Sequence, residues 1–144
     1  MIAYVVTVGL SLGRFGMHDL IPRAARPEEL DYVKNSWVKS YEDSPWGQSL
    51  PREIFRRGHS ALVEALVPIS TVLVVPSAED DTTILGWLAA KGSTLHYVYV
   101  RAKVRRMGIA KLLVQAYKPE IEKYSHPTRI RTPWQWDPYE IGRL

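Results

Sequence analysis

The apolar positions of this chain follow a helical spacing before Ser70 and the pattern of strands after it. A short strand is predicted at residues 19–24. A helix is predicted to open at residues 25–29, because a proline suits the first turn and two glutamates favour the positive end of the helix dipole. The apolar side chains of this helix then share one face, and they are Leu30, Val33, Trp37 and Tyr41.

A second helix is predicted after a loop rich in turn-forming residues, 42–47. Ser49 is its predicted N-terminal cap, since a serine hydroxyl accepts a hydrogen bond from a free amide of the first turn. Ile54, Leu62 and Leu66 form its predicted apolar side. Two consecutive helices are therefore expected ahead of the main sheet.

Apolar runs at residues 71–75, 84–90 and 94–100 predict an antiparallel meander, because short connections join neighbouring strands. Residues 108–117 return to helical spacing. Residues 129–132 are predicted as a further strand, which the crossover helix would place parallel to strand 94–100. The predicted fold class is α/β (α+β), with a mixed central sheet.

The N-terminal residues 2–12 alternate large and smaller side chains, which is typical of a strand with one buried face. We expect an extra N-terminal strand there, or an interface element through which the chain forms a homo-oligomer. The run is too short to span a bilayer and lacks the positively charged start of a secretory signal, so no membrane segment is expected. The predicted organisation is an N-terminal extension, 1–18, and a single domain, 19–144.

Composition limits the chemistry that the chain can perform. Cysteine is absent, which excludes disulfides, a thiolate zinc site and a cysteine nucleophile. No metal is expected, and a cytoplasmic location is the default. The formal charge of +4 is spread along the chain. It indicates either affinity for an anion or an ordinary solvated surface.

The junction between strand 94–100 and helix 108–117 has the most informative pattern. Free N–H groups at a helix N-terminus form an anion site together with the positive end of the dipole. Gly108 and Ala110 would let a phosphate approach the main chain, while Arg105 and Arg106 add positive charge. The pattern predicts a pyrophosphate site.

The spacing Arg105-x-x-Gly108-x-Ala110 resembles the Arg/Gln-x-x-Gly-x-Gly/Ala signature of the GNAT (GCN5-related N-acetyltransferase) superfamily. The predicted order of elements resembles that family over residues 19–132. The resemblance implies a GNAT fold with helices on both faces of the sheet. The short core and the pair Ser36-Trp37 resemble small GNAT-like proteins of tailed bacteriophages.

The resemblance also implies where acetyl-CoA, the cosubstrate, would bind. The strand around Val98 and Val100 would pair with the pantetheine arm, and the N–H of Val100 would polarise the acyl carbonyl. Lys103, Arg105 or Lys111 would reach the adenosine 3′-phosphate, or are solvated cations. The residues implied for acetyl-CoA are Val98, Tyr99, Val100, Arg105, Arg106, Met107, Gly108, Ile109, Ala110 and Lys111.

Catalytic residues are indicated less directly. His96 is a candidate general base because its ordinary pKa of ~6.5 suits proton transfer near neutral pH, and a structural, hydrogen-bonded histidine is the alternative. Tyr139 is the candidate acid that the resemblance implies, with Tyr117 and Tyr124 as substitutes. Residues 132–144 leave little room for the usual fourth helix and closing strands, so the family's C-terminus is shortened here.

The predicted function is acetyl-CoA-dependent N-acyltransfer to an amine acceptor that the sequence does not identify. A first alternative is modification of nucleic-acid bases, because aromatic and basic residues alternate near Arg129, Arg131, Trp134 and Trp136. A second alternative is a non-catalytic binding or virion protein. Nucleic acid remains a less favoured partner.

Overall fold

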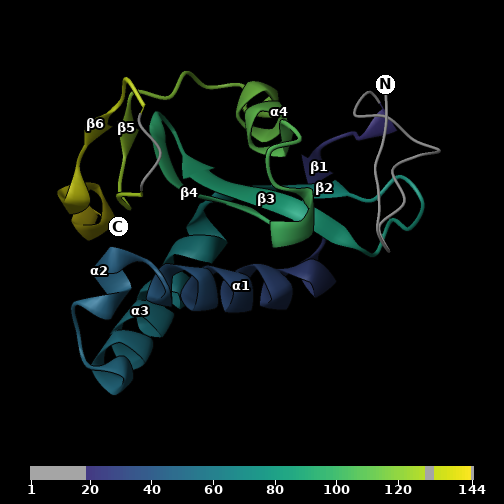
Figure 1. The fold of residues 1–144 in the computed structure, drawn as a ribbon. Coiled ribbons are helices and arrows are strands. Elements are labelled where there is room, and N and C mark those ends of the chain that lie inside the picture. The colour runs from purple at the N-terminus through teal and green to yellow at the C-terminus, as the bar shows by residue number, and fades with distance from the viewer. Residues whose placement is uncertain (1–18, 129–131, 144) are drawn as a thin grey trace.

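A computed structural model describes residues 19–128 and 132–143 of the chain. They form one six-stranded sheet whose strands stand in chain order, with helices packed on both faces (Figure 1). The predicted α/β class with a mixed sheet is confirmed. The predicted N-terminal strand, 2–12, lies outside the described residues, as do residues 129–131.

The strands are defined as β1 (Arg23–Ala24), β2 (Thr71–Pro76), β3 (Ile84–Lys91), β4 (Thr94–Val100), β5 (Lys123–Tyr124) and β6 (Gln135–Trp136). The first four pair antiparallel, which confirms the predicted meander. β4, β5 and β6 pair in parallel. β1 is shorter than the predicted strand 19–24.

A two-residue strand, β5, takes the place beside β4 that was predicted for residues 129–132. Thr94 pairs with Lys123 and Leu95 with Tyr124, whereas Thr132 belongs to no strand. Residues 129–131 of the predicted strand lie outside the described residues, so that strand stays a prediction. Two residues are too few for a period-two pattern to show in the sequence.

The helices are α1 (Leu30–Glu42), α2 (Pro45–Gln48), α3 (Arg52–Leu66) and α4 (Ile109–Ala116). A 3-10 turn, Pro27–Glu29, leads into α1 as the proline and glutamates predict. The first three helices cover one face of the sheet and α4 covers the other (Figure 1). The sheet thus separates two apolar cores.

The core beneath α1 and α3 is built on tryptophan. Val33, Trp37 and Tyr41 are buried on α1 as predicted, and Trp37 packs against Trp87 of β3 with ring centroids 5.5 Å apart. The Trp87 indole donates a hydrogen bond of 2.8 Å to the hydroxyl of Ser36. This bond satisfies the polar end of a fully buried indole.

The buried face of α3 differs from the prediction. Ile54 is 49% exposed, although Leu66 is buried as expected. The inward residues are Phe55, His59, Val63 and Leu66. The helix begins after Pro51, and Ser49 instead follows α2 as its C-terminal residue, so the predicted serine cap is wrong as well. Because His59 is one of the buried residues, a search for apolar positions alone did not find the helical period of this face.

β4 contains a bulge that matters for the site. Ala89 pairs with Tyr97 and Ala90 with Leu95, so His96 is the extra residue on β4. A bulge interrupts the alternation of faces along a strand. Leu95 consequently joins the core that includes Val98, and strict alternation no longer assigns a face to His96.

Gly86 of β3 lets α4 approach the sheet. A Cβ at this position would lie 2.8 Å from the Tyr99 carbonyl oxygen and 3.0 Å from Cγ2 of Ile109. Glycine alone fits such close contact without displacing its neighbours. The first residue of α4 is therefore held directly against the sheet.

Candidate active site

The turn between β4 and α4 holds its backbone in uncommon conformations. A 3-10 turn, Ala102–Val104, follows β4, and Val104 is buried as an anchor. Arg106 has φ 69° and Gly108 has φ 86°. Glycine adopts positive φ freely, whereas arginine does so at an energetic cost, and such costs concentrate at ligand-binding turns.

The first turn of α4 keeps its amides available. The amide of Leu112 bonds to the Gly108 carbonyl at 2.9 Å, which starts the helical ladder. The amides of Ile109, Ala110 and Lys111 precede that bond and have no acceptor within the helix. Gly108 is the N-cap residue, and no side-chain hydrogen bond caps this end of the helix. These donors and the positive dipole end are the local features on which the sequence-based prediction of an anion site rests.

The outer edge of β4 is open beyond its contact with β5. The amide of Arg101 bonds to the Leu85 carbonyl at 2.9 Å, which places the backbone groups of Tyr99 toward β3. The N–H and C=O of Val98 and Val100 therefore point away from β3. The guanidinium of Arg105 donates from Nε to the Val100 carbonyl at 2.9 Å, which leaves the Val100 N–H available.

A cavity of about 1060 Å³ joins these two features. Its walls are the open edge of β4, the first turns of α4 and the segment that follows β5. The volume lies at the upper end of the range for ligand clefts. The predicted cosubstrate residues that line it are Val98, Tyr99, Val100, Arg105, Arg106, Gly108, Ile109, Ala110 and Lys111, whereas Met107 packs into the core beside α4.

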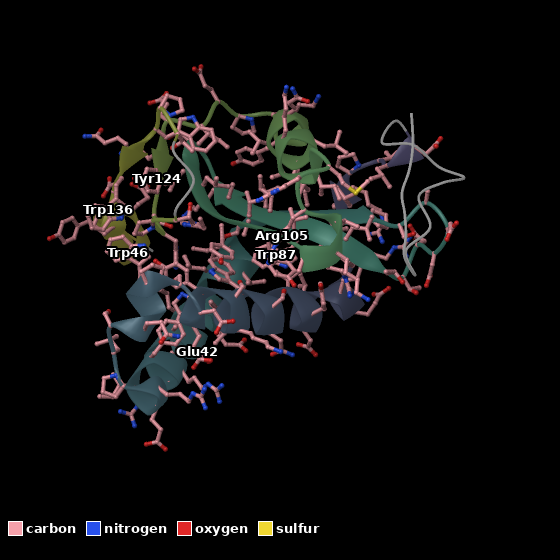
Figure 2. All side chains as sticks on the ribbon, in the orientation of Figure 1. Glu42, Trp46, Trp87, Arg105, Tyr124 and Trp136 are labelled. Atoms are coloured by element: carbon pink, nitrogen blue, oxygen red, sulfur yellow. The ribbon has the colours of Figure 1, made fainter. Side chains whose placement is uncertain are left out.

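A second cavity of about 640 Å³ lies on the α1 side of the end of β4. Tyr97, Tyr99 and Arg105 line both cavities. Figure 2 shows Arg105 near the middle of the sheet and Tyr124 on the β5 side. The two cavities therefore meet around the end of β4.

Buried polar residues form a chain beside the first cavity. The Nδ1 atom of His96 lies 2.8 Å from the hydroxyl of Ser125, which lies 2.9 Å from Nδ1 of His126. The Nε2 atoms of His126 and His59 are 3.2 Å apart. His96 and His126 line the cavity, so the predicted base is at the site. Ser125, His126 and His59 were not predicted.

The environment of these rings keeps them neutral. Burial lowers the pKa of His96 and of His59 to about 4. Burial also lowers the pKa of His126, to about 3, and the other two histidines add to that effect. Because a neutral imidazole has one donor and one acceptor nitrogen, each ring is able to relay a hydrogen bond.

Tyrosines at the site differ from the predicted acid. Tyr139 is 77% exposed and lines neither cavity. Tyr117 donates its hydroxyl hydrogen to the Gly92 carbonyl at 2.7 Å, a structural contact. Tyr124 lines the first cavity, and Tyr97, whose hydroxyl lies 3.0 Å from the Ser40 hydroxyl, lines both. Burial raises the pKa of Tyr97, which keeps its proton in place.

The C-terminal segment is attached to the helical layer. Trp46 of α2 and Trp136 of β6 lie side by side (Figure 2), with ring centroids 6.3 Å apart. Trp134 lines the first cavity. The segment therefore forms one wall of the cleft without filling it.

Among residues 19–128 and 132–143, no three side chains of the metal-binding types lie together. Over the same ranges, every helix is too short or too polar to cross a bilayer.

The fold of this chain is similar to that of several solved structures. YjaB from Escherichia coli, in its apo form in solution, matches with a TM-score of 0.52 and 22% identity. The match covers 67% of this chain and 62% of YjaB. Over the matched part, the chain shares the fold of YjaB.

Two further structures were matched at lower TM-scores. A GCN5-related N-acetyltransferase from Rhodopseudomonas palustris, also described as a class-II aminotransferase, has a TM-score of 0.49 and 16% identity, with 67% of this chain and 62% of that protein covered. A possible acetyltransferase from Clostridium difficile 630 has a TM-score of 0.46 and 17% identity, with 73% and 77% covered. No family model and no curated protein matches the sequence. A shared fold does not by itself define an activity, so the function is argued from the site.

Proposed function

We propose that this protein is an acyl-CoA-dependent N-acyltransferase that transfers the acyl group of acetyl-CoA directly to an amine. One observation carries the proposal: a single cavity joins the uncapped first turn of α4 to the open edge of β4. A diphosphate would suit the first feature and an extended, amide-containing arm the second. Coenzyme A contains both groups in that order.

The cosubstrate would be held mostly by main-chain groups. Amides from Arg106 to Ala110 would bind the pyrophosphate, with Lys111 and the side chain of Arg106 exposed nearby for the 3′-phosphate. Val98 and Val100 would pair with the pantetheine arm. The Val100 N–H would then stabilise the negative charge that develops on the acyl oxygen.

The amine would enter through the second cavity. Its ammonium form must lose a proton before it attacks, and His96 at the base of the first cavity would accept that proton. The departing sulfur benefits from an acid. Tyr97 and Tyr124 are better placed for this role than Tyr139, because they line the cleft.

Calorimetry with acetyl-CoA and with CoA tests the proposal. Gly108→Glu is expected to weaken binding about tenfold or more, because a side chain blocks the phosphate and its charge repels it. Gly58→Glu is the matched control, since Gly58 lies on the exposed side of α3 with open space around it. Equal affinity in both variants would refute the phosphate site.

The alternatives gain less support. Arg129 and Arg131 lie outside the described residues. Trp134 lines the cleft, whereas a surface that stacks nucleic-acid bases would need this side chain to be exposed. A non-catalytic role would be favoured by a C-terminal segment that fills the cleft, whereas the described residues 132–143 leave a cavity beside β4. A bacteriophage origin, a cytoplasmic location and oligomerisation through residues 2–12 remain predictions from the sequence.

A further inference from the structure

The histidines beside the cleft form a continuous line of hydrogen bonds from β4 to α3. The order is His96, Ser125, His126 and His59, with separations of 2.8, 2.9 and 3.2 Å. All four residues are buried, with exposed fractions of 2, 4, 5 and 9% in the same order. The members come from distant parts of the chain, so tertiary packing aligns them.

Both ends of the line have an unused nitrogen. Nε2 of His96 and Nδ1 of His59 are buried without a hydrogen-bond partner among the described residues. The Nδ1 atom of His96 is occupied by Ser125, so Nε2 is the ring nitrogen that remains for a ligand in the cavity that His96 lines. An unpaired buried nitrogen is unfavourable, and a nitrogen that exchanges protons with a ligand explains its retention.

Two proton arrangements satisfy all three bonds with every ring neutral and with the serine hydroxyl donating along the line. In the first, His96 carries its proton on Nδ1, His126 on Nε2 and His59 on Nδ1. In the second, His96 carries its proton on Nε2, His126 on Nδ1 and His59 on Nε2. The serine hydroxyl reverses its direction between the two arrangements.

We infer that this line is a proton relay that serves His96 during acyl transfer, an inference that rests on the proposed function. In the first arrangement the amine's ammonium gives a proton to Nε2 of His96. The Nδ1 proton of His96 passes to Ser125, the serine proton to Nδ1 of His126, and the Nε2 proton of His126 to His59. His59 becomes an imidazolium, and its Nδ1 proton passes to water when the buried Nδ1 atom becomes exposed by movement of this 9% exposed residue, which leaves the second arrangement.

The return step supplies the acid that the reaction needs. In the second arrangement, Nε2 of His96 carries a proton that it gives to the departing CoA thiolate. The bonds then reverse as His59 takes up a proton at Nδ1, which restores the first arrangement. Over one cycle, the ammonium proton leaves at His59 and the thiolate proton enters there. The nitrogen loses its second proton to solvent in the cleft as the amide forms, so one proton is released for each amide made.

The surroundings of His59 suit the end of a relay. Its ring stacks on Tyr41 and on Phe55, with centroids 5.0 Å away in both cases. Aromatic faces stabilise a passing positive charge. His59 is also the most exposed of the three histidines.

The charges around the line do not trap a proton at His96. Burial is the main reason that the pKa of His96 is lowered. The charge of Glu140 raises this pKa, and the charge of Lys91 lowers it. His126 faces Trp37, Tyr41 and Tyr97, and its other ionisable neighbours are the two histidines of the line.

Ser125→Ala tests the relay, because it breaks the line and keeps all three histidines. With acetyl-CoA and a panel of primary amines, kcat is expected to fall about tenfold or more while acetyl-CoA affinity measured by calorimetry stays within about twofold. Ser125→Thr keeps the hydroxyl and is expected to retain most of kcat. When the wild-type rate is measured in mixtures of H2O and D2O, the plot of rate against deuterium fraction should be curved, because several protons move together in a relay. Unchanged kcat in Ser125→Ala would overturn the inference.

Imidazole nitrogen NMR gives a test without turnover. His96 and His59 are expected to carry their protons on the same named nitrogen, and His126 on the other one. Any other combination would overturn the relay even if acetyl-CoA binds, whereas lost acetyl-CoA binding with the expected combination would refute only the proposed function.

Discussion

At the scale of single residues, the polar groups in the core are the least expected feature. Burying a polar atom without a partner costs about 1–3 kcal/mol. His59 and His96 each bury one such nitrogen. The proposed relay would give both nitrogens a role in proton transfer.

These histidines predict that acid destabilises the fold. The pKa values of His59 and His96 fall from 6.5 to about 4, and that of His126 to about 3. Between these values and 6.5 the unfolded chain binds protons that the folded chain excludes, so stability decreases as the pH falls through this window.

The expected slope is at most about 1.4 kcal/mol per pH unit for each histidine. Urea denaturation at about pH 7, 6 and 5 measures it through the change in the free energy of unfolding. A free energy that stays constant over this window would show that the rings are not held neutral.

At the scale of elements, the sequence predicts what depends on local pattern. β4 begins and ends at the residues that its β-branched and aromatic run predicts. α4 begins directly after Gly108, which is the start that the helical spacing predicts. The buried face of α3 was missed because His59 interrupts the apolar stripe. β5 was missed because pairing with β4, rather than its own two residues, defines it.

The candidate site also has one part that local sequence predicts and one part that depends on tertiary contacts. The turn predicted to bind an anion is local, because Arg105, Gly108 and Ala110 lie in one stretch of sequence. The histidine line joins residues 59, 96 and 126 by tertiary contact, and no local spacing indicates it. The bulge at His96 likewise depends on the strand register.

The contact between α4 and β3 should be sensitive to a single methyl group. Gly86→Ala is expected to destabilise the fold by about 1–3 kcal/mol, because the new Cβ meets the Tyr99 carbonyl and Ile109. Gly58→Ala, on an open helix surface, is expected to stabilise it by about 0.5–1 kcal/mol. Thermal denaturation of both variants measures the pair, and equal effects would contradict the close packing of α4.

At the scale of the whole molecule, the sheet divides the protein into two layers whose cavities meet at one strand end. The α4 side offers main-chain donors, and the α1 side offers tyrosine rings and cations. Arg105 borders both cavities and binds the Val100 carbonyl. This arrangement would bring a bound thioester and an amine together from opposite sides of β4.

Backbone amide NMR with CoA and with pantetheine tests this account most directly. CoA is expected to shift the amides of Gly108, Ile109, Ala110 and Lys111 together with those of Val98 and Val100. Pantetheine, which lacks the pyrophosphate, should shift only the β4 amides. Shifts from CoA that leave the first turn of α4 unchanged would contradict the central claim.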